Sequence, residues 1–144
     1  MFIQLHGCLF SKTNLIIQQN PDKMDFLTKT LSRFLFSVPI LIFGLFHFMN
    51  TQAMAGMVPQ WIPGSAFWVI LTGIALIAAA VGIMARVWDY WAGFLLGIML
   101  LIFALTIHLP AAIGGDQMGM TMLLKDTAMA AGAWMYAGYL ARRI

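Results

Sequence analysis

Charged residues are scarce in this sequence. Asp, Glu, Lys and Arg make up 9% of its 144 residues, whereas they make up about 25% of an ordinary soluble domain. Two long segments, 34–85 and 90–115, contain none of the four, and the mean hydropathy is +0.88. Uninterrupted apolar segments of this length are typical of membrane-spanning helices. The composition therefore predicts an all-α integral membrane protein whose main partner is the lipid bilayer.

Cysteine is nearly absent as well. The one cysteine, Cys8, excludes an internal disulfide, a CxxC redox centre and a cysteine-ligated metal cluster. The sequence also contains no phosphate-binding loop, nucleophile–base pair or dinucleotide fingerprint. The net charge of +3 does not indicate nucleic-acid binding, because the basic residues lie at the ends of hydrophobic runs, where membrane orientation explains them.

Four hydrophobic runs predict four membrane-spanning helices. Each run is close to the roughly 20 residues that a helix needs to cross a bilayer. They are Leu31–Asn50, Ala66–Ala85, Trp88–Leu109 and Thr121–Ala141. We therefore expect residues 29–144 to form one polytopic four-transmembrane-helix bundle. Pro39 lies inside the first run, where neighbouring groups of a membrane bundle can compensate for the lost hydrogen bond.

Turn-forming residues separate these runs. Thr51–Ser65 is an uncharged loop with glycine, proline and tryptophan, and Ser65 suits the cap of the next helix. A charged, aromatic turn around Arg86 leads into the third run, and Ala111–Met120 is the expected loop before the fourth.

The first 28 residues are expected to form an N-terminal tail outside the bundle. Residues 1–23 lack the basic region and the small-residue cleavage site of a signal peptide. Met24 begins a sequence that leads directly into the first run, so we interpret residues 1–23 as a misassigned start or a disordered tail.

Positive charges are distributed unequally between the two ends of the predicted helices. One side carries Lys12, Lys23, Lys29, Arg33, Arg86, Arg142 and Arg143, and the other carries only Lys125. Loops on the cytoplasmic side of a membrane are enriched in Lys and Arg. We therefore expect both termini to be cytoplasmic.

Residue spacing predicts how the helices pack. Phe36, Ile40, Phe43 and His47 recur at intervals of four, three and four, so they share one helix face. Small residues recur at intervals of four in the second and third runs, which permits close backbone approach. The pairs are Ala75 and Ala79, Ala78 and Gly82, and Gly93 and Gly97. Within a multi-span chain the last pair favours internal packing over dimerisation.

Lys125 and Asp126 are the least expected residues of the chain, because they lie inside the fourth hydrophobic run. A charge at the bilayer centre costs about 2.5–3.5 kcal/mol on insertion scales, so Asp126 needs a partner. Lys125, His108 and His47 are available at a similar depth. Lys125 and Asp126 are about 100° apart around a helix, so we expect them not to share a face. These four residues form the only candidate site.

Several simpler interpretations of the same residues stay open. Either histidine could lie at the lipid–water boundary or bind a loop carbonyl, and Lys125 could extend towards the headgroups. The two histidines could in principle ligate a haem, and His47, His108 and Asp126 have ligand types that suit zinc, but no spacing signature supports either. Met118, Met120 and Met122 could hold Cu(I), although methionine is far more often apolar filler.

A series of short segments occurs in a fixed order along the chain. They are Arg33, Gly44–His47, Gly56–Pro59, the small-residue second run ending near Arg86, His108–Pro110 and Leu124–Gly132. Through these segments the chain from Lys29 to Arg143 resembles the DoxX family of small four-span bacterial membrane proteins. The resemblance implies a bacterial cytoplasmic (inner) membrane protein, in some members associated with quinone-linked sulfur oxidation or with thiol and oxidative-stress complexes. Many members have no assigned activity.

The favoured hypothesis is a membrane subunit of a quinone-linked or thiol/oxidative-stress redox complex, which is not a self-sufficient enzyme and acts with a redox protein partner. A quinone would bind at the corner formed by His47, His108, Lys125 and Asp126, between apolar walls from Phe36, Phe43 and Trp61. The alternatives are a small-solute or proton transporter and a structural assembly partner. The protein could form a homo-oligomer in any of these three roles.

Overall fold

The computed structural model describes residues 26–141, and these are helical with no strand. The elements are η1 (Phe26–Leu31), α3 (Ser32–Met49), α4 (Thr51–Ala55), α5 (Ser65–Ala85), α6 (Asp89–Phe103), η2 (Ala104–His108), α7 (Leu109–Ile113) and α8 (Gln117–Ala141). The all-α prediction is confirmed for this part of the chain. The interpretations of residues 1–23 and of Met24 lie outside the described residues.

Three helical stretches are long and apolar enough to cross a membrane. They are Phe26–Met49, Ser65–Ala85 and Asp89–Ile113. This supports the prediction of a membrane protein with several spans. The fourth long helix, α8, has 25 residues but is not among the three stretches, and it contains the Lys125-Asp126 pair.

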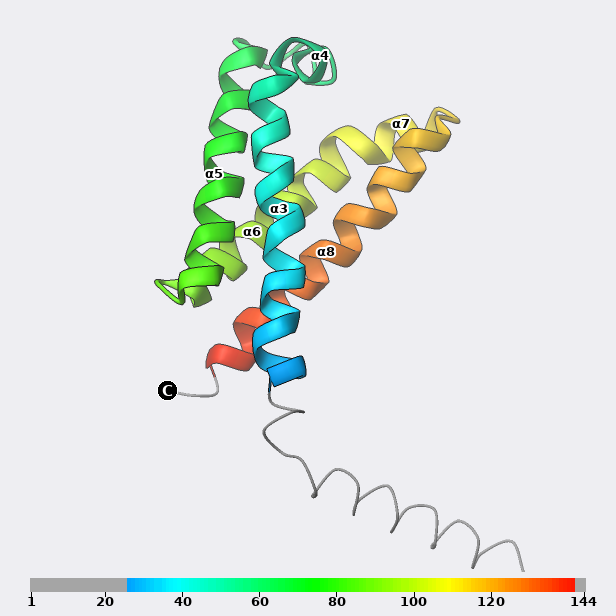
Figure 1. The fold of residues 1–144 in the computed structure, drawn as a ribbon. Coiled ribbons are helices and arrows are strands. Elements are labelled where there is room, and N and C mark those ends of the chain that lie inside the picture. The colour runs from blue at the N-terminus through cyan, green and yellow to red at the C-terminus, as the bar shows by residue number, and fades with distance from the viewer. Residues whose placement is uncertain (1–25, 142–144) are drawn as a thin grey trace, which may run out of the picture. The chain divides into compact units, whose positions relative to one another are not determined.

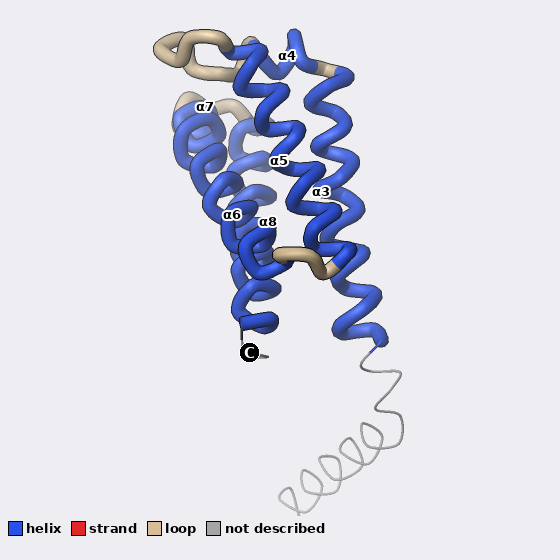
Figure 2. The backbone as a smooth tube through the Cα atoms, turned by 90° about the vertical axis from the view of Figure 1, so that its left-hand side faces the viewer, coloured by secondary structure: helices blue, strands red, loops and turns tan. Residues whose placement is uncertain are grey.

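The described residues divide into two units between Phe36 and Ser37, and the second unit contains residues 37–141. In the second unit α3 lies beside α5, and α6 lies beside α8 (Figures 1 and 2). The polypeptide passes from α5 into α6 through a short turn, so the two hairpins are joined at one end. Ile40, Ile83 and Leu96 are among the largest fully buried side chains. Many large apolar side chains on these helices are exposed, as expected of a protein surrounded by lipid.

Glycine brings α3 and α5 into backbone contact. A Cβ built on Gly44 would lie 2.7 Å from Ile77 Cγ1 and 3.1 Å from the Gly73 carbonyl oxygen. A Cβ built on Gly73 would lie 2.9 Å from His47 Cβ. Membrane helices associate largely through such close van der Waals packing. Ile40, Phe43 and His47, predicted to share a face, are all buried or partly buried.

Small residues also hold α6 against α8. Gly93 and Gly97 are buried; a Cβ on Gly93 would lie 3.1 Å from the Ala133 carbonyl oxygen, and a Cβ on Gly97 would meet the Trp134 indole. Trp134 Nε1 donates a hydrogen bond to the Phe94 carbonyl oxygen at 3.2 Å. The prediction that this glycine pair serves internal packing is therefore confirmed.

The predicted loop Ala111–Met120 is wrong. The helix of the third run continues through Pro110 to the end of α7, and α8 begins at Gln117. Pro110 lies in the first turn of α7, directly after the π-helical segment η2. The hydrogen-bonding register of the helix changes at this point, so the N–H that proline lacks is not needed there. Asp116 caps the start of α8, because its carboxylate accepts a hydrogen bond from the Met118 N–H at 2.9 Å. The loop between α7 and α8 is therefore short.

The segment Thr51–Ser65 also differs from its prediction. Its first five residues form the short helix α4, so only the remainder is loop. Gly64, with φ of +73°, precedes α5, and no side-chain hydrogen bond caps that helix. The predicted cap at Ser65 is therefore wrong, because the serine is already the first residue of the helix. Trp61 is 77% exposed, which suits a ring in the membrane interface.

The Gly44–Gly73 crossing gives a stability prediction. We expect Gly44→Ala to lower the free energy of unfolding by about 1–3 kcal/mol, because the new methyl group overpacks a backbone contact. The matched control is Gly138→Ala, where an added Cβ meets nothing within 4 Å. This control should be neutral or stabilising by up to about 1 kcal/mol, since alanine favours helix. Unfolding in detergent, followed by helical circular dichroism, measures both, and equal stabilities would contradict the crossing.

Candidate functional site

His108 is presented by a widened helical turn. It is the last residue of η2, the π-helical segment between α6 and α7. A π turn inserts an extra residue into the helix and rotates the side chains that follow, and such turns are frequent at functional sites. Thr106 closes part of this turn by donating its hydroxyl to the Ile102 carbonyl oxygen at 2.6 Å. The resulting rotation aims the His108 imidazole at α8.

Asp126 is the buried partner of His108. The residue is only 4% exposed, and it lies ten residues after Asp116 on the face of α8 that packs against the η2 segment. Its Oδ2 atom is 3.1 Å from His108 Nε2. An ionised carboxylate can only accept hydrogen bonds, so Nε2 carries the proton and donates it. The expectation that Asp126 is packed and paired is correct.

Lys125 forms an ion pair with the other oxygen of the same carboxylate. Its Nζ atom is 3.2 Å from Asp126 Oδ1, and about a third of its side chain is exposed. The expectation that neighbouring residues 100° apart cannot share a face is wrong here. The lysine stem is long and flexible enough to turn its ammonium group back over the next residue. His108, Asp126 and Lys125 thus form one connected group, hereafter the triad.

Phe43 links the triad to α3. The Lys125 ammonium lies over the Phe43 ring, 4.3 Å from its centroid, within the range of a cation–π interaction. A partly desolvated contact of this kind is worth about 0.5–2 kcal/mol. Sequence reasoning placed Phe43 on the packed face of the first run but missed its role as a partner of Lys125. No spacing rule connects residues so far apart in the chain.

His47 has a different partner from His108. Its Nδ1 atom donates to the Phe43 carbonyl oxygen, one turn earlier in the same helix, at 2.8 Å. The two histidines therefore differ: His108 binds the carboxylate of another helix, whereas His47 binds its own backbone. His47 is connected to the triad through Phe43, and the predicted four-residue corner is reduced to three directly interacting residues.

The described residues contain no cluster of three or more His, Cys, Asp or Glu side chains able to hold a metal ion. His47, His108 and Asp126, the set considered for zinc, are thus not brought together in this part of the chain. Met118, Met120 and Met122 lie in the first turns of α8, and the first two are 61% and 46% exposed. Successive members are about 200° apart around the helix, so the three sulfur atoms do not converge.

A second carboxylate fastens the opposite end of the α6–α8 hairpin. Asp89 opens α6, and its Oδ2 atom accepts a hydrogen bond from the Tyr136 hydroxyl at 3.3 Å. Asp89 Oδ1 accepts the Tyr90 N–H at 3.1 Å. This contact was also missed by sequence reasoning, because a single tyrosine in an apolar helix carries no spacing signal. Unlike Asp126, Asp89 has no basic partner in these contacts, so it acts as a structural clamp.

The triad can hold and move a proton. The carboxylate fixes His108 with its Nε2–H directed at Asp126, which leaves Nδ1 as the ring atom that accepts a proton from elsewhere. The same carboxylate stabilises the imidazolium that would result, as in other Asp–His pairs. Lys125 neutralises the carboxylate when the histidine is neutral. The arrangement therefore suits proton exchange with a small ligand better than metal binding.

The fold and this site define a helical membrane protein with a His–Asp–Lys triad built around a buried carboxylate. Residues 36–117, more than half of the chain, match the family described as Domain of unknown function (DUF8561), and the protein belongs to that family. The matched segment includes His47 and His108 and ends before Lys125 and Asp126. No curated protein and no solved structure matches the chain.

Energetic coupling tests this geometry. In a double-mutant cycle, His108→Ala and Asp126→Asn should couple by about 0.5–3 kcal/mol in the free energy of unfolding, because they share a buried interaction. The matched cycle of His47→Ala with Asp126→Asn should be additive within about 0.5 kcal/mol. Coupling of Asp126 to His47 as strong as to His108 would contradict the assignment of partners.

Proposed function

We propose that the protein is a DoxX-like subunit of a membrane redox complex, in which the triad binds a quinone and exchanges protons with it. The observation that carries the proposal is the Asp126 carboxylate, buried among apolar helices and paired with both His108 and Lys125. Buried ionisable groups in membrane helices are costly and tend to be retained for proton or ligand handling. The resemblance to the DoxX family supports the quinone as the ligand.

A four-span topology is part of the proposal. At 1.5 Å per residue, the 25 residues of α8 extend over about 37 Å, more than the hydrocarbon thickness of about 30 Å. The helix packs along α6, which belongs to a stretch able to span a membrane. Lys125 and Asp126 lower its hydropathy but are paired. The positions of Lys29, Arg33 and Arg86 then support cytoplasmic termini in a bacterial inner membrane.

This topology gives the triad a depth. Asp126 is nine residues from the start of α8, which is about 14 Å along the helix axis. The triad would then lie within the outer half of the hydrocarbon, a level that the ring of a lipid-soluble quinone reaches. Lys125 would extend its partly exposed ammonium towards the outer headgroups.

The chemistry follows from the free ring nitrogen. A quinol hydroxyl would donate to His108 Nδ1 and then transfer its proton, and Asp126 would stabilise the imidazolium. Lys125 would hold the carboxylate in place and offer a route for the proton to leave. Oxidation of the quinol to the quinone releases two protons and two electrons. His108 would release the first proton towards the outer surface before it accepts the second, and both electrons would pass to a redox partner protein, because the chain has a single cysteine and no cysteine-based centre to accept them. Phe43 would form part of the apolar wall.

Quinone binding by triad variants tests the proposal. Full-length protein in mild detergent is equilibrated with a short-chain ubiquinone, separated by gel filtration and analysed for quinone per protein. We expect His108→Leu and Asp126→Asn to weaken binding about tenfold to a hundredfold, because each removes a charge-assisted hydrogen bond. Asp116→Asn is the matched control, since Asp116 lies in the exposed loop before α8, and it should bind as the unaltered protein does.

Two outcomes would contradict the quinone site. Unchanged affinity in both triad variants would show that the triad does not touch the quinone. Absence of binding to the unaltered protein, together with solute-dependent proton flux in liposomes that Asp126→Asn abolishes, would instead support the transporter.

A further inference from the structure

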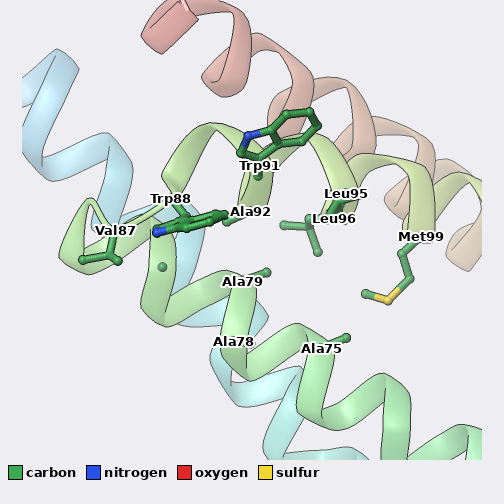
Figure 3. Close-up of a pocket in the computed structure, with 11 residues that line it drawn as sticks. Ala75, Ala78, Ala79, Val87, Trp88, Trp91, Ala92, Leu95, Leu96 and Met99 are labelled. Atoms are coloured by element: carbon green, nitrogen blue, oxygen red, sulfur yellow. The ribbon is translucent and has the colours of Figure 1, made fainter.

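A groove between α5 and α6 lies apart from the triad. It has a volume of about 380 Å³, within the range of roughly 300–1,000 Å³ that is usual for ligand pockets. On the α5 side it is lined by small residues that include Ala75, Ala78 and Gly82. On the other side Trp88, at the turn, and Trp91, on α6, supply large aromatic surfaces (Figure 3).

The lining explains which chemistry the groove accepts. The lining residues are all apolar or aromatic, so the groove offers contact area and almost no hydrogen bonds. Its depth comes from short side chains facing long ones: alanine and glycine on α5 leave space that Trp91 and its neighbours on α6 do not fill. A flexible hydrocarbon chain fits such a surface, whereas a polar solute would lose its hydration without compensation.

The groove ends at the turn between α5 and α6, where Val87 and Trp88 line it. Arg86 is the residue before them in this turn, and Arg86 and Trp88 have φ of +57° and +56°. They are the two non-glycine residues with positive φ in the described part of the chain. Glycine adopts this conformation more readily, yet both positions carry large side chains. Both residues are exposed, Trp88 by 78%, so the turn at one end of the apolar groove carries a basic residue next to the residues that line the groove.

We propose that this groove binds an anionic phospholipid. One acyl chain lies along α5 between the small residues and Trp91, the phosphate pairs with Arg86, and Trp88 lies at the level of the headgroup. Arginine binds phosphate through a rigid fork of donors, and tryptophan is favoured at the membrane interface. The apolar lining suits an acyl chain, and the exposed Arg86 in the adjoining turn suits the phosphate of the same lipid.

Charge complementarity favours a lipid over a second copy of the chain. The acids in the described residues are Asp89, Asp116 and Asp126. Asp126 is buried in the triad and Asp89 is bound by Tyr136. Asp116 is exposed but precedes α8, at the opposite end of the α6–α8 hairpin from Arg86. Residues 26–141 of a second copy seated in the groove would therefore bring no exposed, unpartnered carboxylate to Arg86, whereas a phospholipid brings its phosphate.

Native mass spectrometry of the full-length protein in detergent tests the proposal, with phosphatidylglycerol and phosphatidylcholine as matched anionic and zwitterionic probes. We expect a one-to-one complex that forms preferentially with phosphatidylglycerol. Arg86→Gln should reduce this preference about fivefold, the effect of one basic residue near an anionic headgroup. Arg86→Lys should keep most of the preference. Lys29→Gln is the control that removes a positive charge from another helix.

A second pair of variants tests the groove itself. Ala78→Leu fills it without removing a buried side chain, since Ala78 lines the groove and is exposed, and it should reduce binding of both lipids. Ala128→Leu, which adds the same side chain to an exposed position of α8, should leave binding unchanged. Equal binding of the two lipids by the unaltered protein, unaltered binding by Ala78→Leu, or a dimer that Ala78→Leu disrupts in place of the lipid complex would each overturn the proposal.

Discussion

A carboxylate buried among apolar helices must be fully paired, and Asp126 obtains its partners from two helices at once. His108 reaches it across the α6–α8 hairpin and Lys125 reaches it from the adjacent position. Removing one partner from such a group typically costs about 3–5 kcal/mol, because the charge is left without compensation. This requirement fixes the rotation of α8 against the η2 segment, and the π turn that orients His108 is the local distortion that satisfies it.

The remaining helix contacts use shape in place of charge. Gly44 and Gly73 bring the backbones of α3 and α5 together, and Gly93 and Gly97 do the same for α6 and α8. In lipid there is no hydrophobic drive between helices, so close packing supplies most of the attraction. Polar contacts such as Tyr136 with Asp89 and Trp134 with the Phe94 carbonyl oxygen do not pair opposite charges. The triad is the exception, which is why it is the candidate for function.

The two hairpins are in contact at Phe43. Its ring lies under the Lys125 ammonium, and its carbonyl oxygen accepts the Nδ1–H of His47. A single residue of α3 thereby contacts the charged group of α8 and orients the second histidine. A ligand that displaces the lysine from this ring would change the surroundings of both histidines, so the proposed quinone site would be linked to α3 although the triad itself is built from the other hairpin.

Composition and spacing were sufficient to predict the helical class, the bounds of α3 and α5 to within one residue, and the burial and pairing of Asp126. These features depend on local hydrophobicity and on the period of the α-helix, which are properties of the sequence itself. The tertiary structure alone decided that Lys125 folds back onto Asp126, that His108 and not His47 is its histidine partner, and that the helix continues past Pro110. Each of these depends on rotation about a helix axis or on side-chain direction, and those are set by contacts between segments distant in the chain.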